Sequence, residues 1–237
     1  MAELATVVLV HGGASGAWTW HLVADELAAR GIDSRAPDLP SCSAPDNAIG
    51  PADDVAHVRR VMDEIGRPIV LVGNSYGGWV ITDAANGRGD VRHLVYLSGV
   101  MPDPGRPLME TIMSASAPGD EIGLEFLDDG RVVFDVEADL RTSYQLAPEA
   151  EQDLVRSHAG TPMSLGSAPA VLDEVAWTTT PSTYVVCTED LVFRPDAQRA
   201  WAKRATHAVE IAGDHCAQHS HPIEIADIVE RIARDAD

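Results

Sequence analysis

Ser75 is the residue of this sequence whose surroundings most clearly suggest chemistry. It lies within Gly73-Asn74-Ser75-Tyr76-Gly77, which matches the pattern G-x-S-x-G. The short apolar run 68–73 leads into it and a helical pattern follows, the context in which this pattern presents a nucleophilic serine. A tight strand-to-helix turn strains the serine backbone and leaves room only for small residues two positions before and after it. We therefore predict that Ser75 is a nucleophile, against the alternative of a chance match.

A serine nucleophile needs a general base, and that base needs a carboxylate to orient it. Where the serine sits in this kind of turn, the chain order is serine, then the acid, then the histidine. His215 follows a predicted strand and precedes the last predicted helix, while Asp190 follows the strand predicted one unit earlier. We predict His215 as the base and Asp190 as the acid, with Asp103 as the alternative acid.

Other polar residues near the predicted base have simpler interpretations. We expect Glu189 and Asp214 to be solvated loop carboxylates, and His219 and His221 to form a solvated start of the final helix. Together with His215, these two histidines could suggest a metal site. However, the sequence has no helical H-E-x-x-H pattern there, so no metal site is predicted.

An acyl-transfer site also needs main-chain N–H donors for the developing oxyanion. Tyr76 directly follows the serine, and Gly13 lies in the glycine-rich turn 11–16 that follows the first predicted strand. We predict that these two residues donate to the oxyanion; the alternative is that the glycines only permit a tight turn. His11 precedes the serine in the chain, so we expect it to brace the loop.

The elements that must position these residues alternate between strand and helix. Strands are predicted at 5–10, 32–36, 68–73, 91–97, 182–187 and 207–211, and helices at 18–30, 53–65, 75–85, 196–204 and 222–235. Such alternation predicts a mostly parallel sheet with helices on both faces. Between about 101 and 178 the periodicity is weak, apart from a predicted helix at 149–157. We predict a single domain over 1–237, with a core of 1–100 and 179–237 and an inserted cap over the active site.

Composition narrows the possible partners. The chain has 17 basic and 37 acidic residues, a formal net charge of −20, which disfavours nucleic acids and anionic membranes as partners. The cysteines Cys42, Cys187 and Cys216 are odd in number and widely spaced, which predicts reduced thiols. Without an apolar run of membrane-spanning length or a recognisable leader, we expect a cytoplasmic protein, as a monomer or homodimer.

The chain resembles the single-domain α/β hydrolases that group plant methyl esterases and hydroxynitrile lyases with bacterial esterases. The matching stretches are 8–20, 73–78, 188–195 and 213–215. The resemblance implies an α/β-hydrolase fold, with a triad and a pair of oxyanion donors at the positions predicted above. It also implies a cap-covered apolar pocket that Trp18, Tyr76, Trp177 and Phe193 could line, although a role in the core is an equal alternative for all but Tyr76.

Two departures from this group bear on the reaction. Its hydroxynitrile lyases carry a threonine after the first-loop histidine and a lysine after the catalytic histidine, where this chain has Gly12 and Cys216. This favours hydrolysis of a carboxylic ester of a small, largely apolar molecule through an acyl-enzyme on Ser75, without a cofactor. One alternative is a lyase or natural-product tailoring enzyme, for lactone or hydroxynitrile chemistry, with the same triad. The other is a non-catalytic receptor for a small ligand.

Overall fold

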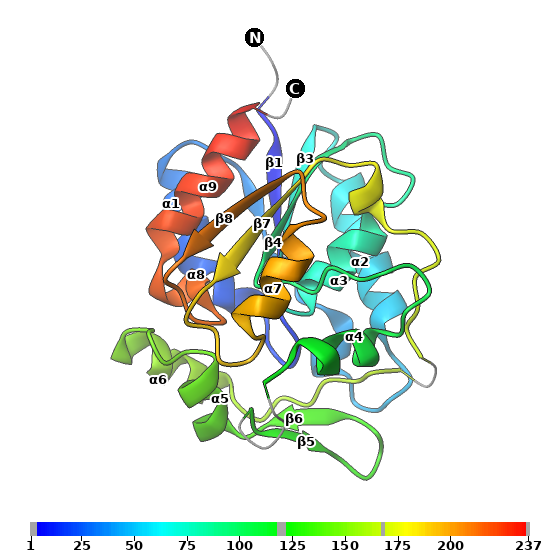
Figure 1. Cartoon of the computed structure of the whole chain (residues 1–237), viewed down its shortest axis with the longest axis vertical. Helices are drawn as coiled ribbons and strands as arrows, with labels where there is room; N and C mark the ends of the chain where they lie inside the picture. Colours follow the sequence, from blue (N-terminus) through cyan, green and yellow to red (C-terminus); the bar gives the residue numbers. More distant parts are fainter. Residues whose placement is uncertain (1–3, 118–121, 167–168, 236–237) are drawn as a thin grey trace.

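A computed structural model describes residues 4–117, 122–166 and 169–235 of the protein. Its centre is a six-stranded parallel sheet in the order β2-β1-β3-β4-β7-β8 (Figure 1). The strands are β1 (Thr6–Val10), β2 (Ser34–Arg35), β3 (Ile69–Asn74), β4 (Val91–Leu97), β7 (Ser182–Cys187) and β8 (His207–Ile211). The predicted parallel sheet is confirmed, and β4, β7 and β8 have the predicted bounds.

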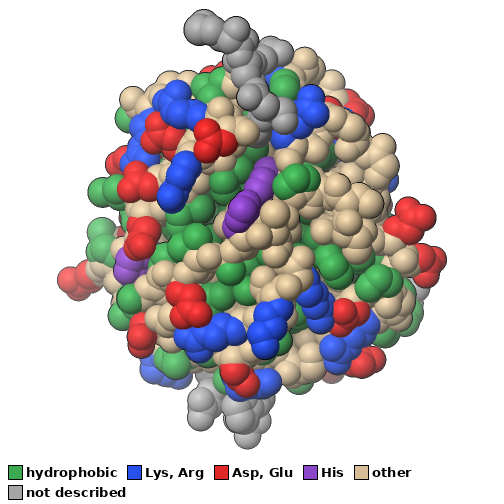
Figure 2. Space-filling view, turned by 45° about the horizontal axis from the view of Figure 1, so that its top comes forward, with side chains coloured by type: hydrophobic (Ala, Val, Ile, Leu, Met, Phe, Trp, Pro, Cys, Tyr) green, Lys and Arg blue, Asp and Glu red, His purple; other side chains and the backbone are tan. Residues whose placement is uncertain are grey.

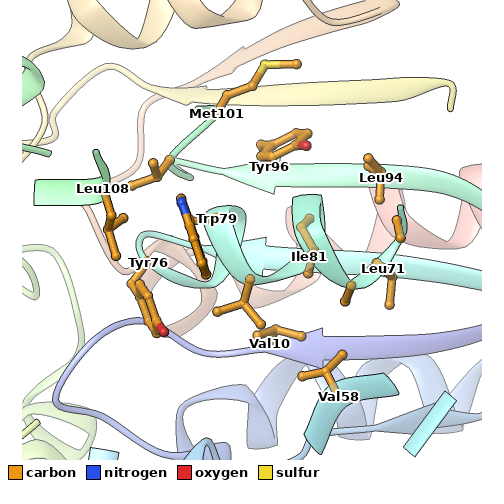
Figure 3. Close-up of a cluster of buried hydrophobic side chains, with 14 of the residues drawn as sticks. Val10, Val58, Leu71, Tyr76, Trp79, Ile81, Leu94, Tyr96, Met101 and Leu108 are labelled. Carbon is orange, nitrogen blue, oxygen red and sulfur yellow. The ribbon is translucent and has the colours of Figure 1, made fainter. Parts of the chain in front are cut away.

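Helices cover both faces of the sheet because its strands alternate their side chains between two cores. Along β1, Val7 and Leu9 pack into one apolar cluster, while Val8 and Val10 pack into the other. The first cluster includes residues of α1 (His21–Ala29) and α9 (Pro222–Asp235). The second includes residues of α2 (Pro51–Asp63), α3 (Gly77–Ala84) and α7 (Pro195–Ala202), and part of it is drawn in Figure 3.

The chain between β4 and β7 contains several short elements, most of which the sequence pattern did not resolve. They are α4 (Leu108–Ala115), β5 (Leu124–Phe126), β6 (Val132–Phe134), α5 (Val136–Thr142), α6 (Glu149–His158) and the 3-10 turn η3 (Ala176–Thr178). Only α6 was predicted, because strands of three residues and helices of one or two turns carry too little periodicity to be recognised. Figure 1 shows α4 to α6 and the β5–β6 hairpin gathered beyond the carboxyl end of β1.

The remaining short elements shape the loops. Two 3-10 turns, η1 (Ala17–Trp20) and η2 (Pro40–Ser43), follow the first two strands, and α8 (Ala217–Ser220) precedes α9. The three cysteines are free and buried. No helix in the described part of the chain is both long and apolar enough to span a membrane. On the face drawn in Figure 2, lysine and arginine side chains are interspersed with acidic ones.

Candidate active site

The turn that holds Ser75 has the strained geometry that its sequence predicts. Ser75 lies between the end of β3 and the start of α3, with φ = 53°, in the left-handed region that side chains other than glycine rarely adopt. A Cβ at Gly73 would lie 2.5 Å from the carbonyl oxygen of Gly77. A Cβ at Gly77 would lie 2.4 Å from the carbonyl oxygen of Val10. Both glycines are therefore required by close backbone approach.

We expect Gly77→Ala to destabilise the protein by about 3 kcal/mol, since the added methyl group meets backbone that cannot rotate away. Urea unfolding of the variant and the wild type measures this difference. Gly89→Ala is the matched control, because a Cβ at Gly89 meets nothing within 4 Å; its effect should stay within about 1 kcal/mol. Equal effects of the two substitutions would contradict the steric explanation.

His215 and Asp190 meet in the interior, each on the loop that follows its strand. The Nδ1 atom of His215 lies 2.8 Å from Oδ2 of Asp190, and both side chains are almost fully buried. Burial alone would lower the pKa of His215, but the charge and hydrogen bond of Asp190 outweigh it and raise that pKa. This arrangement fixes the proton on Nδ1 and leaves Nε2 able to accept one.

Asp190 is itself held in place by three other donors. Oδ1 accepts hydrogen bonds from the main-chain N–H groups of Val192 (2.7 Å) and Phe193 (2.9 Å). Oδ2 accepts a further one from Nε2 of Gln198 (2.7 Å), beside the bond to His215. With four hydrogen bonds, the buried carboxylate is compensated and cannot rotate freely.

Two side chains that the sequence analysis did not single out anchor the loop of His215. The main-chain carbonyl of His215 accepts hydrogen bonds from Nδ2 of Asn74 (3.0 Å) and from the hydroxyl of Ser98 (2.7 Å). Asn74 directly precedes Ser75, so the loop of the histidine is tied to the turn of the serine. The sequence offered no signal for this contact, because 141 positions separate the two partners.

One cavity brings together residues predicted for the site from separate parts of the chain. Ser75, His215, Gly13 and Tyr76 line it, and so do Trp18 and Phe193. The rest of its wall comes largely from residues between 108 and 165. In the described parts of the chain, the main-chain N–H groups of Gly13 and Tyr76 donate to no other protein atom. They are thus available to a bound oxygen.

The hydroxyl of Tyr76 is anchored away from its main-chain N–H. It donates to Oδ2 of Asp54 (2.6 Å), which also accepts from the Ser41 hydroxyl (2.6 Å). Asp54 is fully buried, and this burial raises the pKa of its carboxyl. The network fixes the ring of Tyr76 against α2.

The structure places several of the other predicted residues differently. Trp177 is not among the described residues that line the cavity; its indole N–H donates to the carbonyl of Pro102 (3.0 Å), and the guanidinium of Arg204 lies over its ring. Asp103, the alternative acid, pairs with Arg204 at 2.9 Å, whereas the ring of His215 contacts Asp190 instead. The pocket position of Trp177 was predicted from the resemblance alone. In the structure Trp177 lies in η3, and its side chain packs outside the cavity wall.

Two residues predicted to be solvated are buried instead. Asp214 is fully buried and accepts hydrogen bonds from the N–H of Leu146 (2.9 Å) and the Ser220 hydroxyl (2.7 Å). His219 is 1% exposed, and its Nδ1 lies 2.7 Å from Oε2 of Glu151 on α6. These predictions were wrong because α5 and α6 fold over the loop and the start of α8. Glu189, by contrast, is exposed as predicted.

His219 also belongs to a group that could hold a metal ion, with His21 and Glu151. Ligand atoms of the three residues lie within 4.8 Å of one another, the one such group in the described chain. Glu151 already contacts both rings, at 2.7 Å for His219 and 3.4 Å for His21. These contacts join α6 to α1 and α8 without an ion, so the geometry is accounted for by ordinary polar packing.

His11 braces the glycine-rich loop, as predicted. Its Nε2 accepts a hydrogen bond from the N–H of Leu39 (2.9 Å), and its Nδ1 donates to the carbonyl of Gly12 (2.8 Å). Burial lowers the pKa of His11 to about 4. The ring is therefore neutral in the folded protein throughout the neutral and mildly acidic range.

The pKa of His11 predicts a specific loss of stability in acid. Its ordinary value is 6.5, so between that pH and about 4 the unfolded chain takes up a proton that the folded protein does not. The neutral His11 ring therefore contributes fully to the free energy of unfolding above pH 6.5, and this contribution is lost as the pH falls towards about 4. The free energy of unfolding of the wild type should fall by about 2 kcal/mol more between pH 7 and pH 5 than that of His11→Gln. Urea titrations at both pH values test this, and parallel pH dependences would contradict it.

Comparisons with known proteins agree on the architecture. The sequence model of a family described as "Alpha/beta hydrolase family" matches residues 7–228. Methylesterase 8 of Arabidopsis thaliana is 28% identical over 206 aligned positions, covering 81% of this chain and 75% of that protein. Probable esterase PIR7A of Oryza sativa subsp. indica is 26% identical over 261 aligned positions, covering 97% of each chain.

A solved structure extends the likeness to three dimensions. Polyneuridine aldehyde esterase superposes with a TM-score of 0.86 at 24% identity, covering 98% of this chain and 100% of that one. At this identity the likeness establishes the fold alone. It confirms the fold that the sequence resemblance implies.

Proposed function

Since this chain belongs to the alpha/beta hydrolase family, we propose that it hydrolyses carboxylic esters through an acyl-enzyme on Ser75. The observation that carries the proposal is the convergence of three chain segments on one cavity. Ser75, in its strained turn, and His215 both line that cavity, and Asp190 holds Nδ1 of His215 from behind. Relatives at 26–28% identity that are named as a methylesterase and a probable esterase support ester cleavage.

The proposed mechanism uses protein groups and water alone. Nε2 of His215 takes the proton of the Ser75 hydroxyl as its oxygen attacks the ester carbonyl. The N–H groups of Gly13 and Tyr76 stabilise the oxyanion, and Asp190 stabilises the imidazolium. The imidazolium then protonates the leaving alkoxide, which departs as the alcohol. Water, deprotonated by the same histidine, cleaves the acyl-enzyme and releases the acid.

The surroundings of the nucleophile favour hydrolysis over cyanohydrin cleavage. Gly12 and Cys216 both line the cavity, at the positions where the hydroxynitrile lyases of the resembling group carry threonine and lysine. A Cβ at Gly12 would lie 3.2 Å from Cβ of Ser75, so any side chain there would sit beside the nucleophile. Without those polar groups, a departing cyanide has no cationic partner at this point of the wall.

We also propose that residues 101–178 form a cap and the remaining chain the core. The support is that Leu108, Val132, Tyr144 and Met163 face the same cavity as the serine. A wall of apolar side chains over the nucleophile would exclude water from the bound ester and select a small, largely apolar substrate.

A fluorophosphonate probe tests the proposed nucleophile directly. We expect covalent labelling of the wild type at one residue, Ser75, located by peptide mass spectrometry, and no labelling of Ser75→Ala. Ser116→Ala is a matched control for a buried serine in the wall of the same cavity, and it should still be labelled. If the wild type neither reacted with the probe nor hydrolysed any of a panel of p-nitrophenyl and methyl esters, the proposal would fail.

A further inference from the structure

The cavity contains a carboxylate for which the proposed mechanism has no use. Asp139, on α5, lines the same cavity as Ser75 and His215. The other titratable side chains of its wall are Tyr76, Tyr144, His158, His215 and Cys216. In the described chain, Asp139 is thus the one carboxylate of that wall, and no lysine or arginine contributes to it.

The charge of this carboxylate is only partly compensated by the described part of the protein. No basic side chain in the described residues lies within ion-pair distance of Asp139. Burial raises the pKa of Asp139 to about 6, against smaller opposing effects of the Ser143 hydroxyl and of His215. At neutral pH the group is therefore ionised in a mainly apolar chamber, which is costly unless a donor reaches it.

An ionised carboxylate can only accept hydrogen bonds. The Ser143 hydroxyl is one donor within this cavity, and a bound substrate can supply another. A substrate that carried its own carboxylate or phosphate would meet Asp139 with no lysine or arginine in the described wall to offset it, and would be disfavoured. Asp139, Ser75 and His215 line the same cavity, so an ester attacked by the serine lies in the chamber that also contains this carboxylate.

From these observations, the geometry points to Asp139 as a specificity-determining residue that selects esters bearing a hydrogen-bond donor, a hydroxyl or a protonated amine, near the ester group. The inference rests on the proposed function, because it assigns the substrate class of the same site. An unpaired charge inside a binding cavity is typical of functional positions, since it weakens the protein unless a ligand uses it.

A matched series of ligands tests the inference. Methyl 3-phenylpropanoate provides the parent skeleton, and its 3-hydroxy, 3-amino and 3-carboxy derivatives add a neutral donor, a cationic donor and an anion at one position. Binding is measured by calorimetry on Ser75→Ala, which cannot turn the esters over in the proposed mechanism. At pH 7.5 we expect the hydroxy and amino esters to bind about 10-fold or more tightly than the parent, and the carboxy ester to bind more weakly than the parent.

Variants of Asp139 in the same background separate the two kinds of donor. Asp139→Asn should abolish the preference for the amino ester but keep part of the preference for the hydroxy ester, because an amide oxygen still accepts. Asp139→Leu should abolish both. Glu137→Gln, which removes an exposed charge from the same helix, is the matched control and should leave all four affinities unchanged. In acid, protonation of Asp139 should remove the preference for the amino ester as the pH falls through about 6.

The results distinguish failure of this inference from failure of the proposed function. If the wild type hydrolysed all four esters with equal kcat/KM and Asp139→Asn changed none of them, Asp139 would have no role in selection, while ester hydrolysis would stand. A uniform loss of affinity for every ligand in Asp139→Asn would likewise overturn the inference, since it would indicate a structural role. If Ser75→Ala preferred donor-bearing ligands while the wild type turned over no ester, the binding preference would stand and the hydrolase proposal would fall.

Discussion

Replacing Ser75 by alanine is expected to lower kcat for a p-nitrophenyl ester by about 10⁴- to 10⁶-fold. The serine oxygen forms the bond to the acyl group, so its removal leaves only the cavity and the oxyanion donors to assist attack by water. His215→Ala should cause a loss of similar size, because an unassisted serine hydroxyl is a weak nucleophile. Steady-state kinetics on the wild type and both variants measure these effects.

The double variant Ser75→Ala/His215→Ala provides the sharper measurement. Groups that act as a unit lose their effect together, so the double variant should be hardly slower than either single one. If the loss of kcat in the double variant equalled the product of the two single losses, the residues would act independently. That result would contradict the proposed mechanism. Urea unfolding of each variant serves as the control that the fold is retained.

Replacing Asp190 by asparagine is expected to lower kcat by about 10⁴-fold while leaving the cavity in place. The main-chain N–H groups of Val192 and Phe193 donate to Oδ1, so an amide at this position would keep its oxygen there. Its NH₂ group would then face Nδ1 of His215 and force the proton onto Nε2. In that tautomer the histidine cannot accept the proton of Ser75.

Asp103→Asn is the matched control for this prediction, since Asp103 is the alternative acid in the chain order. Its carboxylate pairs with Arg204, so its replacement should change kcat less than about 3-fold. A large loss in Asp103→Asn together with an active Asp190→Asn would reverse the assignment of the acid. The Asp190 variant also leaves the Nε2 group of Gln198 facing an amide NH₂, so its stability should be measured alongside.

The sequence by itself determined the sheet and the positions of the three predicted catalytic residues. Short apolar runs rich in Val, Ile and Leu specify strands buried on both faces, and the alternation with helices requires them to be parallel. Parallel strands end at the same edge, so residues that follow β1, β3, β7 and β8 meet there, whatever their separation in the chain. Gly73 and Gly77 were recognisable because the close approach of backbone leaves no room for any other residue.

The tertiary structure alone decided which side chains surround that edge. The insertion between β4 and β7 lacks a clear periodicity, so the sequence could not show that α5 brings Asp139 into the cavity or that α6 buries His219. Trp177 was misplaced for the same reason, since its position depends on the packing of η3 against Arg204. Local patterns specify the backbone elements, whereas the lining of the cavity depends on contacts between segments far apart in the chain, which leave no trace in a single sequence.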